Sequence, residues 1–186
     1  MLRNVLLGLV GIAGLPLAVI AGELKPVDVT EGYLGVKWGE SAEKALKTIQ
    51  GQPGLSNVSL EQSLAEGMAG ATISAKRDGG ALFLSFINDK FYSFVIEDFV
   101  ALKGYYTLSE IRDAKLADEA KKLFKTSEGI VLWSSVDIRG TADERATKVG
   151  VKVICKNAKL KDAEIAEAKE KGPDMREEIL GGLVRP

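Results

Sequence analysis

The chain has 186 residues, and its 25 basic and 26 acidic side chains leave a net charge of −1 at pH 7. This length suits one domain with a sizeable hydrophobic core, and the near-neutral balance gives no electrostatic signal for nucleic acid or for an anionic membrane. The sequence contains no histidine, so catalytic triads and metal sites that need an imidazole are excluded.

The segment 1–21 has the pattern of a secretory signal peptide. Arg3 provides a positive charge, and the run from Val5 to Ala21 carries no charged side chain. The alternative is a retained membrane anchor, but the run is slightly short for a spanning helix and Pro16 would interrupt it. We therefore predict a periplasmic or secreted product that does not span the membrane, cleaved after Ala21 or Gly22. No cysteine lies near this point, which argues against lipid attachment.

The first half of the mature chain is expected to form one helix among several strands. Residues 33–38 have the pattern of a short strand, and Ser41 is a candidate N-cap for a helix that ends near residue 51. Apolar periodicity then predicts strands at 58–62, 71–77, 81–87 and 91–97. Tight turns at 78–80 and 88–90 would join them as antiparallel neighbours.

The second half is expected to add a longer helix and a strand pair. The stretch Thr107-Leu108-Ser109-Glu110 matches a capping box, which predicts a helix from there to about Gly129. Strands follow at 130–138 and 145–156. Cys155, the only cysteine, alternates with valines on one face of the second strand, which favours a buried core thiol over a nucleophile. A charged helix from Ala158 to Lys171 and a short amphipathic segment would end the chain.

This order of elements predicts an α+β fold, in which an antiparallel sheet has two main helices packed on one face. A helix followed by a hairpin would occur twice, as in a duplicated unit. The expected organisation is a signal peptide at 1–21, an α+β domain at 22–157 and a charged C-terminal helical tail at 158–186.

Four aromatic residues are candidates for a partner-binding surface, because tryptophan and tyrosine are enriched at such surfaces. They are Trp38, Tyr105, Tyr106 and Trp133. For each of them alone, a core position is the favoured alternative. Tyr105 and Tyr106 are the best surface candidates, since adjacent residues cannot both point into a core. The polar residues beside Trp133 (Ser134, Ser135 and Asp137) are expected to form part of the same surface.

Other chemical motifs are weak, and we predict no catalytic residue, no metal site and no cofactor. Ser41 and Lys44 match a Ser-x-x-Lys pattern, but the companion motifs of penicillin-recognising enzymes are absent, which favours a helix cap. The acidic pairs Glu97-Asp98 and Asp143-Glu144 are expected to be solvated. No calcium-loop or phosphate-loop spacing is present in the sequence.

Two stretches together resemble small exported bacterial domains. They are Gly35-Val36-Lys37-Trp38-Gly39-Glu40-Ser41 and Leu84-Ser85-Phe86-Ile87-Asn88-Asp89-Lys90-Phe91-Tyr92-Ser93. The resemblance is to poorly characterised periplasmic proteins, and more distantly to β-lactamase-inhibitor-like and outer-membrane-assembly lipoprotein folds. It implies a binding module rather than an enzyme. The chain lacks the lipidated cysteine of the assembly lipoproteins and the paired cysteines of the inhibitors.

The sequence thus favours a non-catalytic periplasmic interaction module for a protein or cell-envelope partner, and it leaves the oligomeric state open. Two alternatives remain. One is a carrier of a small apolar ligand or lipid, held between sheet and helix by the phenylalanines at 83, 86, 91 and 94. The more remote one is a histidine-free hydrolase that uses Ser41 and Lys44 or a carboxylate pair.

Overall fold

The computed structural model describes residues 26–65, 68–101, 106–113, 115–140 and 144–168. The expected signal peptide, Tyr105, Asp143 and the part of the tail after residue 168 lie outside the described residues.

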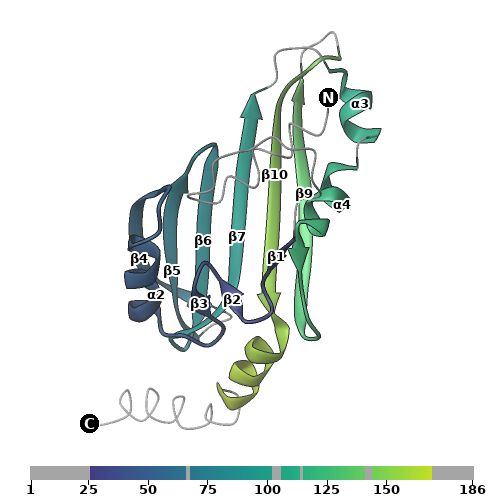
Figure 1. Cartoon of the computed structure of the whole chain (residues 1–186). Coiled ribbons are helices and arrows are strands. Elements are labelled where there is room, and N and C mark those ends of the chain that lie inside the picture. Colours follow the sequence, from purple (N-terminus) through teal and green to yellow (C-terminus); the bar gives the residue numbers. More distant parts are fainter. Residues whose placement is uncertain (1–25, 66–67, 102–105, 114, 141–143, 169–186) are drawn as a thin grey trace, which may run out of the picture.

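A six-stranded antiparallel sheet forms the body of the protein (Figure 1). In spatial order its strands are β4 (Leu55–Ala65), β5 (Met68–Arg77), β6 (Gly80–Ile87), β7 (Lys90–Ala101), β10 (Ala146–Asn157) and β9 (Ile130–Gly140). The first four follow one another as a meander. Strand β10 then adds beside β7, and β9 forms the outer edge.

Helices cover one face of this sheet. Helix α2 (Ala42–Gln50) lies over β4 and β5, and α3 (Leu108–Asp113) and α4 (Leu116–Lys122) lie over β9 and β10 (Figure 1). Both groups are on the same side, because Cys155 packs in the cluster with α2 while Val149 and Val153 of the same strand face pack with α3 and α4. The expected α+β fold with its helices on one face is confirmed.

Short strand pairs accompany the helices. Strand β1 (Val27–Asp28) pairs in parallel with β8 (Phe124–Lys125), and β2 (Gly32–Tyr33) pairs with β3 (Val36–Lys37). Residues 33–38, predicted as one strand, therefore form a hairpin instead. Its turn is made by Leu34 and Gly35, whose φ angles of 50° and 82° reverse the chain.

The longer predicted helix is also interrupted. Helix α3 ends at Asp113, and Lys115 has left-handed backbone angles (φ 49°, ψ 40°) before α4 begins. A left-handed residue cannot continue a right-handed helix, so two short helices replace one long one. The capping box at the start is present as expected: the Thr107 amide donates to the Glu110 carboxylate at 2.7 Å, and the Glu110 amide donates to the Thr107 hydroxyl at 3.1 Å.

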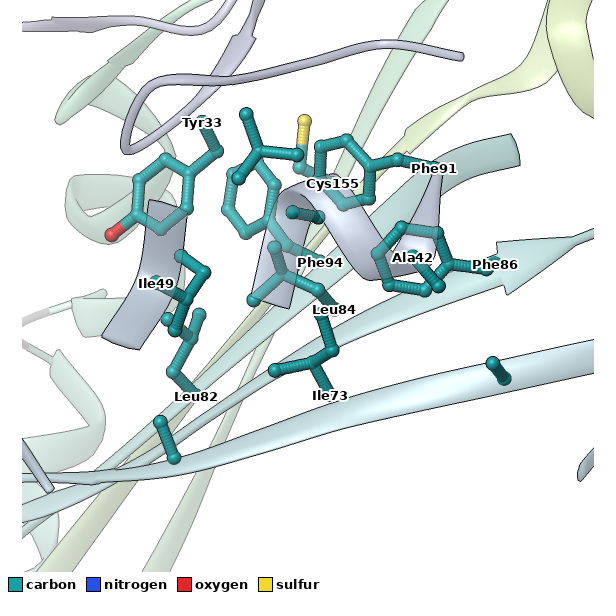
Figure 2. Packing of buried hydrophobic residues seen from close by; sticks show 14 of the residues in the cluster. Tyr33, Ala42, Ile49, Ile73, Leu82, Leu84, Phe86, Phe91, Phe94 and Cys155 are labelled. Atoms are coloured by element: carbon teal, nitrogen blue, oxygen red, sulfur yellow. The ribbon is translucent and has the colours of Figure 1, made fainter. Parts of the chain in front are cut away.

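Aromatic rings fill the core between α2, the β2–β3 hairpin and the sheet. The rings of Tyr33 and Phe94 are stacked with centroids 4.1 Å apart, and Phe91 stacks on Trp38 at 4.7 Å. Figure 2 shows Tyr33, Phe94 and Phe91 above Leu82, Leu84 and Ile73, with the Cys155 sulfur nearby. The thiol is buried as expected, and its burial raises its pKa to about 12.

The residues after β10 continue as a helix over 158–168, which packs on the domain at the end of the sheet (Figure 1). Glu164, which is 5% exposed, accepts hydrogen bonds from Lys90 and from Asn88, both at the β6–β7 turn. Lys159 pairs with Glu128 at 2.9 Å. At least this part of the tail is therefore tied to the sheet by buried and surface polar contacts.

Candidate functional site

The face of the sheet opposite the helices carries the exposed apolar side chains. Among the described residues, the large hydrophobic side chains that are exposed are Phe99 (42%), Val131 (55%) and Trp133 (52%). Side chains alternate between the two faces of a strand, and Trp133 is paired with Ile154 while Phe99 is paired with Gly150. All three exposed side chains therefore lie on the same face, which we call the open face.

The apolar part of the open face crosses three adjacent strands. Val131 and Trp133 come from the edge strand β9, and Ile154 of β10 and Val95 of β7 follow in register, both half-buried. Phe99 lies further along β7. A solvated sheet face is normally covered by polar side chains, so a strip of this kind departs from the usual pattern of an antiparallel sheet.

A shallow hollow of about 190 Å³ lies beside this strip. Its lining is polar and charged apart from Phe99, Gly150 and Val151; the other lining residues are Glu97, Ser135, Asp137, Arg139 and Lys152. Gly150 lies at its base, since its strand partners on both sides are Phe99 and Asp137. A methyl group at residue 150 would come within 2.8 Å of the Phe99 ring, so the absence of a side chain there lets the ring lie over the strand.

Four cationic side chains lie on this half of the open face, and two of them, Arg139 and Lys152, line the hollow. Lys148, Lys152 and Lys156 come from alternate open-face positions of β10, and Arg139 comes from β9. Lys152 pairs with Glu97 at 2.6 Å, and Arg139 pairs with Asp137 at 3.3 Å. The Lys148 ammonium instead lies 4.6 Å from the centre of the Phe99 ring. Within the described ranges, no carboxylate is within ion-pair distance of Lys148 or Lys156.

The other half of the open face is different. Over β4, β5 and β6 it carries mainly small and hydroxyl side chains, together with two charged residues and one half-buried ring: Ser59, Glu61, Ser63, Thr72, Ser74, Lys76, Ala81, Phe83 and Ser85. Ser59 and Ser74 are hydrogen-bonded to each other at 2.8 Å. The aromatic and cationic groups are thus concentrated over β7, β10 and β9, and we call this half the aromatic–lysine patch.

The four aromatic candidates occupy different environments. Trp133 lies on the open face, and Ser135 and Asp137 of the same strand lie on that face too. Trp38 is half-buried and packs against the core on the helix side: its ring stacks on Phe91 and its indole nitrogen donates to the Val29 carbonyl at 3.0 Å. Tyr105 lies outside the described residues.

Tyr106 packs on the helix side of the sheet. It lies against the cluster formed by α3, α4 and β10, and its carbonyl accepts from the Ala146 amide. Ser134 points to the same side, because its hydroxyl donates to the Ala117 carbonyl of α4. The prediction that Tyr106, Ser134 and Trp133 share one surface is therefore wrong. Side chains alternate along β9, so Trp133 lies on the open face while Ser134 lies on the helix side with Tyr106.

Phe99, Val131, Gly150 and the three lysines of β10 were missed as functional candidates. The alternation of lysines with valines in 148–156 does show that one side of this strand is cationic. The alternation does not show which residues of the neighbouring strands lie beside these lysines. Only the pairing of β10 with both β7 and β9 brings Phe99 and the lysines together.

The weaker catalytic candidates have structural roles. Ser41 is the N-cap residue of α2, but its side chain makes no capping bond; Asp89 from the β6–β7 turn accepts from the Ala42 amide at 2.8 Å instead. Lys44 is 73% exposed and pairs with Glu40 at 3.3 Å. Within the part of the chain that is described, no three acidic or cysteine side chains converge in a way that would hold a metal ion.

The acidic pair Glu97-Asp98 is divided between the two faces, so the expectation that both are solvated is wrong. Glu97 is on the open face, but Asp98 is 3% exposed on the helix face. The Arg77 Nε atom lies 3.2 Å from the Asp98 Oδ1 atom. Gly80 lies between these two residues on β6, and a side chain there would collide with the Asp98 carboxylate. Neither Asp98 oxygen accepts a well-aligned hydrogen bond from the described residues. Burial therefore outweighs the arginine charge and raises the pKa of Asp98 to about 6.

Comparison of the chain with family models, with curated proteins and with solved structures gave no match. Among the described residues, no helix combines the length and the apolar character needed to cross a lipid bilayer. The geometry of the open face is therefore the main ground for a functional conclusion.

Proposed function

We propose that the protein is a non-catalytic interaction module that binds a protein partner through the open face of its sheet. The observation that carries this proposal is the joint exposure of Trp133, Val131 and Phe99 on a sheet face that the described helices do not cover. The proposal places the protein in the periplasm or outside the cell, as its N-terminal sequence pattern suggests.

The physical argument is the cost of leaving such side chains in water. Burying apolar surface is favourable by roughly 25 cal/mol per Å², and contiguous exposed apolar patches mark interaction sites. Trp133 is 52% exposed and so has surface available for this purpose. Tryptophan is among the residues that contribute most to binding at protein interfaces. The surrounding lysines would form a polar rim of the kind that such interfaces have.

An apolar-ligand carrier is the less favoured function. Phe86, Phe91 and Phe94 are each fully buried and in ring contact with other core aromatics, and Phe83 lies on the opposite face of β6. Three of the four phenylalanines that would line a pocket are thus packed against other aromatic rings of the core.

Site-specific photo-cross-linking tests the interaction module. A photoreactive phenylalanine derivative would be placed at residue 133, and for control at Lys47 on the exposed side of α2. The chain would be expressed behind its own N-terminal segment in its host. We expect a protein adduct of one defined mass at residue 133 and none at residue 47. The proposal is overturned if residue 133 gives no adduct, or the same adducts as residue 47.

Trp133→Ala and Val131→Ala supply an independent check. Combined, and with the photoreactive group moved to Ser135, they should remove the adduct while leaving the circular dichroism spectrum unchanged. An adduct that survives this double change would show that the apolar strip does not bind the partner.

A further inference from the structure

We infer that the segment of the partner that contacts the aromatic–lysine patch is acidic, and that one of its apolar side chains occupies the hollow over Gly150. The inference rests on the proposed function and adds the chemistry of the partner. The structural observation behind it is that Lys148, which has no ion-pair partner among the described residues, lies on the Phe99 ring at the margin of the hollow, on the half of the open face that carries the exposed aromatics.

The charge of the patch differs from that of the chain. The whole chain has a net charge of −1, whereas the patch holds four cations, Lys148, Lys152, Lys156 and Arg139, against the two carboxylates of Glu97 and Asp137. Both carboxylates already have a cation within 3.3 Å. Among the described residues, the surplus positive charge therefore resides on Lys148 and Lys156 and is available to an anionic partner.

The spacing of the lysines suits an extended segment. Lys148, Lys152 and Lys156 recur every fourth residue on one strand, so their positions are roughly 13 Å apart. A polypeptide lying along β10 would meet a cation at about every fourth residue of its own. Acidic residues opposite Lys148 and Lys156 would each meet a lysine that has no carboxylate partner among the described residues, whereas Lys152 is already paired with Glu97.

The hollow is the place where an apolar side chain of the partner segment would bind. Its volume of about 190 Å³ would accept one large side chain, and the Phe99 ring and the bare backbone of Gly150 form the apolar part of its lining. Lys148 sits on the Phe99 ring, at the margin of the same depression. An apolar group entering there would be flanked by a cation, which is the arrangement that favours an acidic residue next to the apolar one.

A protein segment fits this patch better than an anionic lipid surface does. Glu97 and Asp137 lie inside the patch, where a continuous sheet of lipid phosphates would be repelled by both. A polypeptide can offer hydrogen-bond donors to those two carboxylates and its own carboxylates to the lysines. Mixed charge within the patch thus favours a discrete partner whose charges alternate.

Selection from a displayed library of random twelve-residue peptides on the folded full chain tests the inference. We expect the recovered peptides to be enriched in Asp and Glu beside Leu, Ile, Phe or Trp. Lys148→Glu combined with Lys156→Glu should weaken their binding by at least about tenfold, because it reverses the charge opposite their carboxylates. The matched control is Lys76→Glu, an exposed lysine on the same face but over β5, which should change the affinity less than about twofold.

A second pair of variants tests the hollow. Gly150→Val fills it without altering any charge, and it also displaces the Phe99 ring, because a Cβ atom at residue 150 would lie 2.8 Å from that ring. The backbone does not need glycine at this position, since residue 150 is not among the glycines with positive φ. We expect Gly150→Val to weaken the selected peptides by at least about tenfold. The control is Ser85→Val, an apolar substitution on the open face over β6 and outside the patch, which should leave binding unchanged.

The outcomes separate this inference from the proposed function. Peptides that depend on Trp133 but show no acidic enrichment, or that ignore the lysine reversals, would overturn the acidic chemistry and leave the interaction module standing. Peptides that bind equally well to Trp133→Ala, or a selection that recovers none, would overturn both. Binding to vesicles of phosphatidylglycerol but not of phosphatidylcholine, in the absence of any selected peptide, would replace the protein segment by a lipid surface.

Discussion

Strand β10 shows how differently the two faces of one sheet are built. On the helix side Val149, Val151, Val153 and Cys155 are at most 4% exposed and lie in continuous apolar packing. On the open side the same strand presents three lysines and the half-buried Ile154. Because the helix side supplies the close packing that stabilises the fold, the open side can carry side chains that folding does not require.

The same division is visible within β7. Phe94 is fully buried and stacks on Tyr33, whereas Phe99, five residues later, is 42% exposed beside Lys148. The two phenylalanines therefore allow the two faces of one strand to be compared directly. If stability resides on the helix face and binding on the open face, matched substitutions on the two sides should have opposite consequences.

The largest expected effect on stability is at Phe94. Phe94→Ala removes a buried ring that stacks at 4.1 Å and leaves a cavity, so it should lower the free energy of unfolding by about 3–5 kcal/mol. Urea denaturation followed by circular dichroism measures this. Phe99→Ala is the matched control and should cost less than about 1 kcal/mol. Equal costs for the two would contradict the division of labour between the faces.

A smaller, pH-dependent effect is expected from Asp98, the buried charge on the helix face. Burial raises the pKa of Asp98 from 3.8 to about 6, so the native state binds this proton more tightly than the unfolded state does. Its contribution to stability is therefore fully present below about pH 4 and is lost as the pH rises through about 6, by at most about 3 kcal/mol.

Asp98→Asn tests this linkage because the amide keeps the shape and cannot ionise. Between pH 4 and pH 7.5 the free energy of unfolding of the wild type should fall relative to that of Asp98→Asn. Glu97→Gln, the neighbouring residue on the open face, is the control, and its pH dependence should follow the wild type. Parallel curves for wild type and Asp98→Asn would mean that the Arg77 charge offsets the burial of Asp98 completely.

The third effect concerns the capping box of α3. Thr107→Ala removes the hydroxyl that accepts from the Glu110 amide, and it should cost about 1 kcal/mol of unfolding free energy. Thr107→Ser keeps the hydroxyl and should restore most of that loss. If serine and alanine were equally destabilising, the lost methyl contact rather than the cap would be responsible.

Local chemistry was predictable from the sequence where it depends on neighbouring residues. The Thr107–Glu110 box, the Asn88-Asp89 turn with φ angles of 47° and 61°, and the buried alternation around Cys155 all follow from short patterns. The turn at Leu34 was not predicted, because an apolar residue in the left-handed region has no sequence signature. The break at Lys115, which divides the predicted long helix, was not predicted either, because lysine has no sequence signature for the left-handed region.

The candidate site was predictable only in part, because it depends on register. Trp133 was singled out from its residue type, and the structure places it on the open face. Asp98 was expected to be solvated, and its burial arises from Gly80 and Arg77 on two neighbouring strands. The meeting of Phe99, Gly150 and Asp137 likewise requires three strands to be aligned, which no single segment specifies.

The smallest expected effect on stability is at Trp133, and its small size is what the comparison of the two faces requires. Trp133→Ala should change the free energy of unfolding by only about 0.5 kcal/mol, since half of the ring is already in water and no hydrogen bond of the described residues depends on it. Trp38, whose indole donates to Val29 within the core, is the other tryptophan of the chain, so the two can be separated by fluorescence. Trp133→Ala should remove the emission of the more exposed ring and leave that of the half-buried Trp38. A loss of more than about 2 kcal/mol would instead assign Trp133 to the fold and remove the main reason for placing a partner on this face.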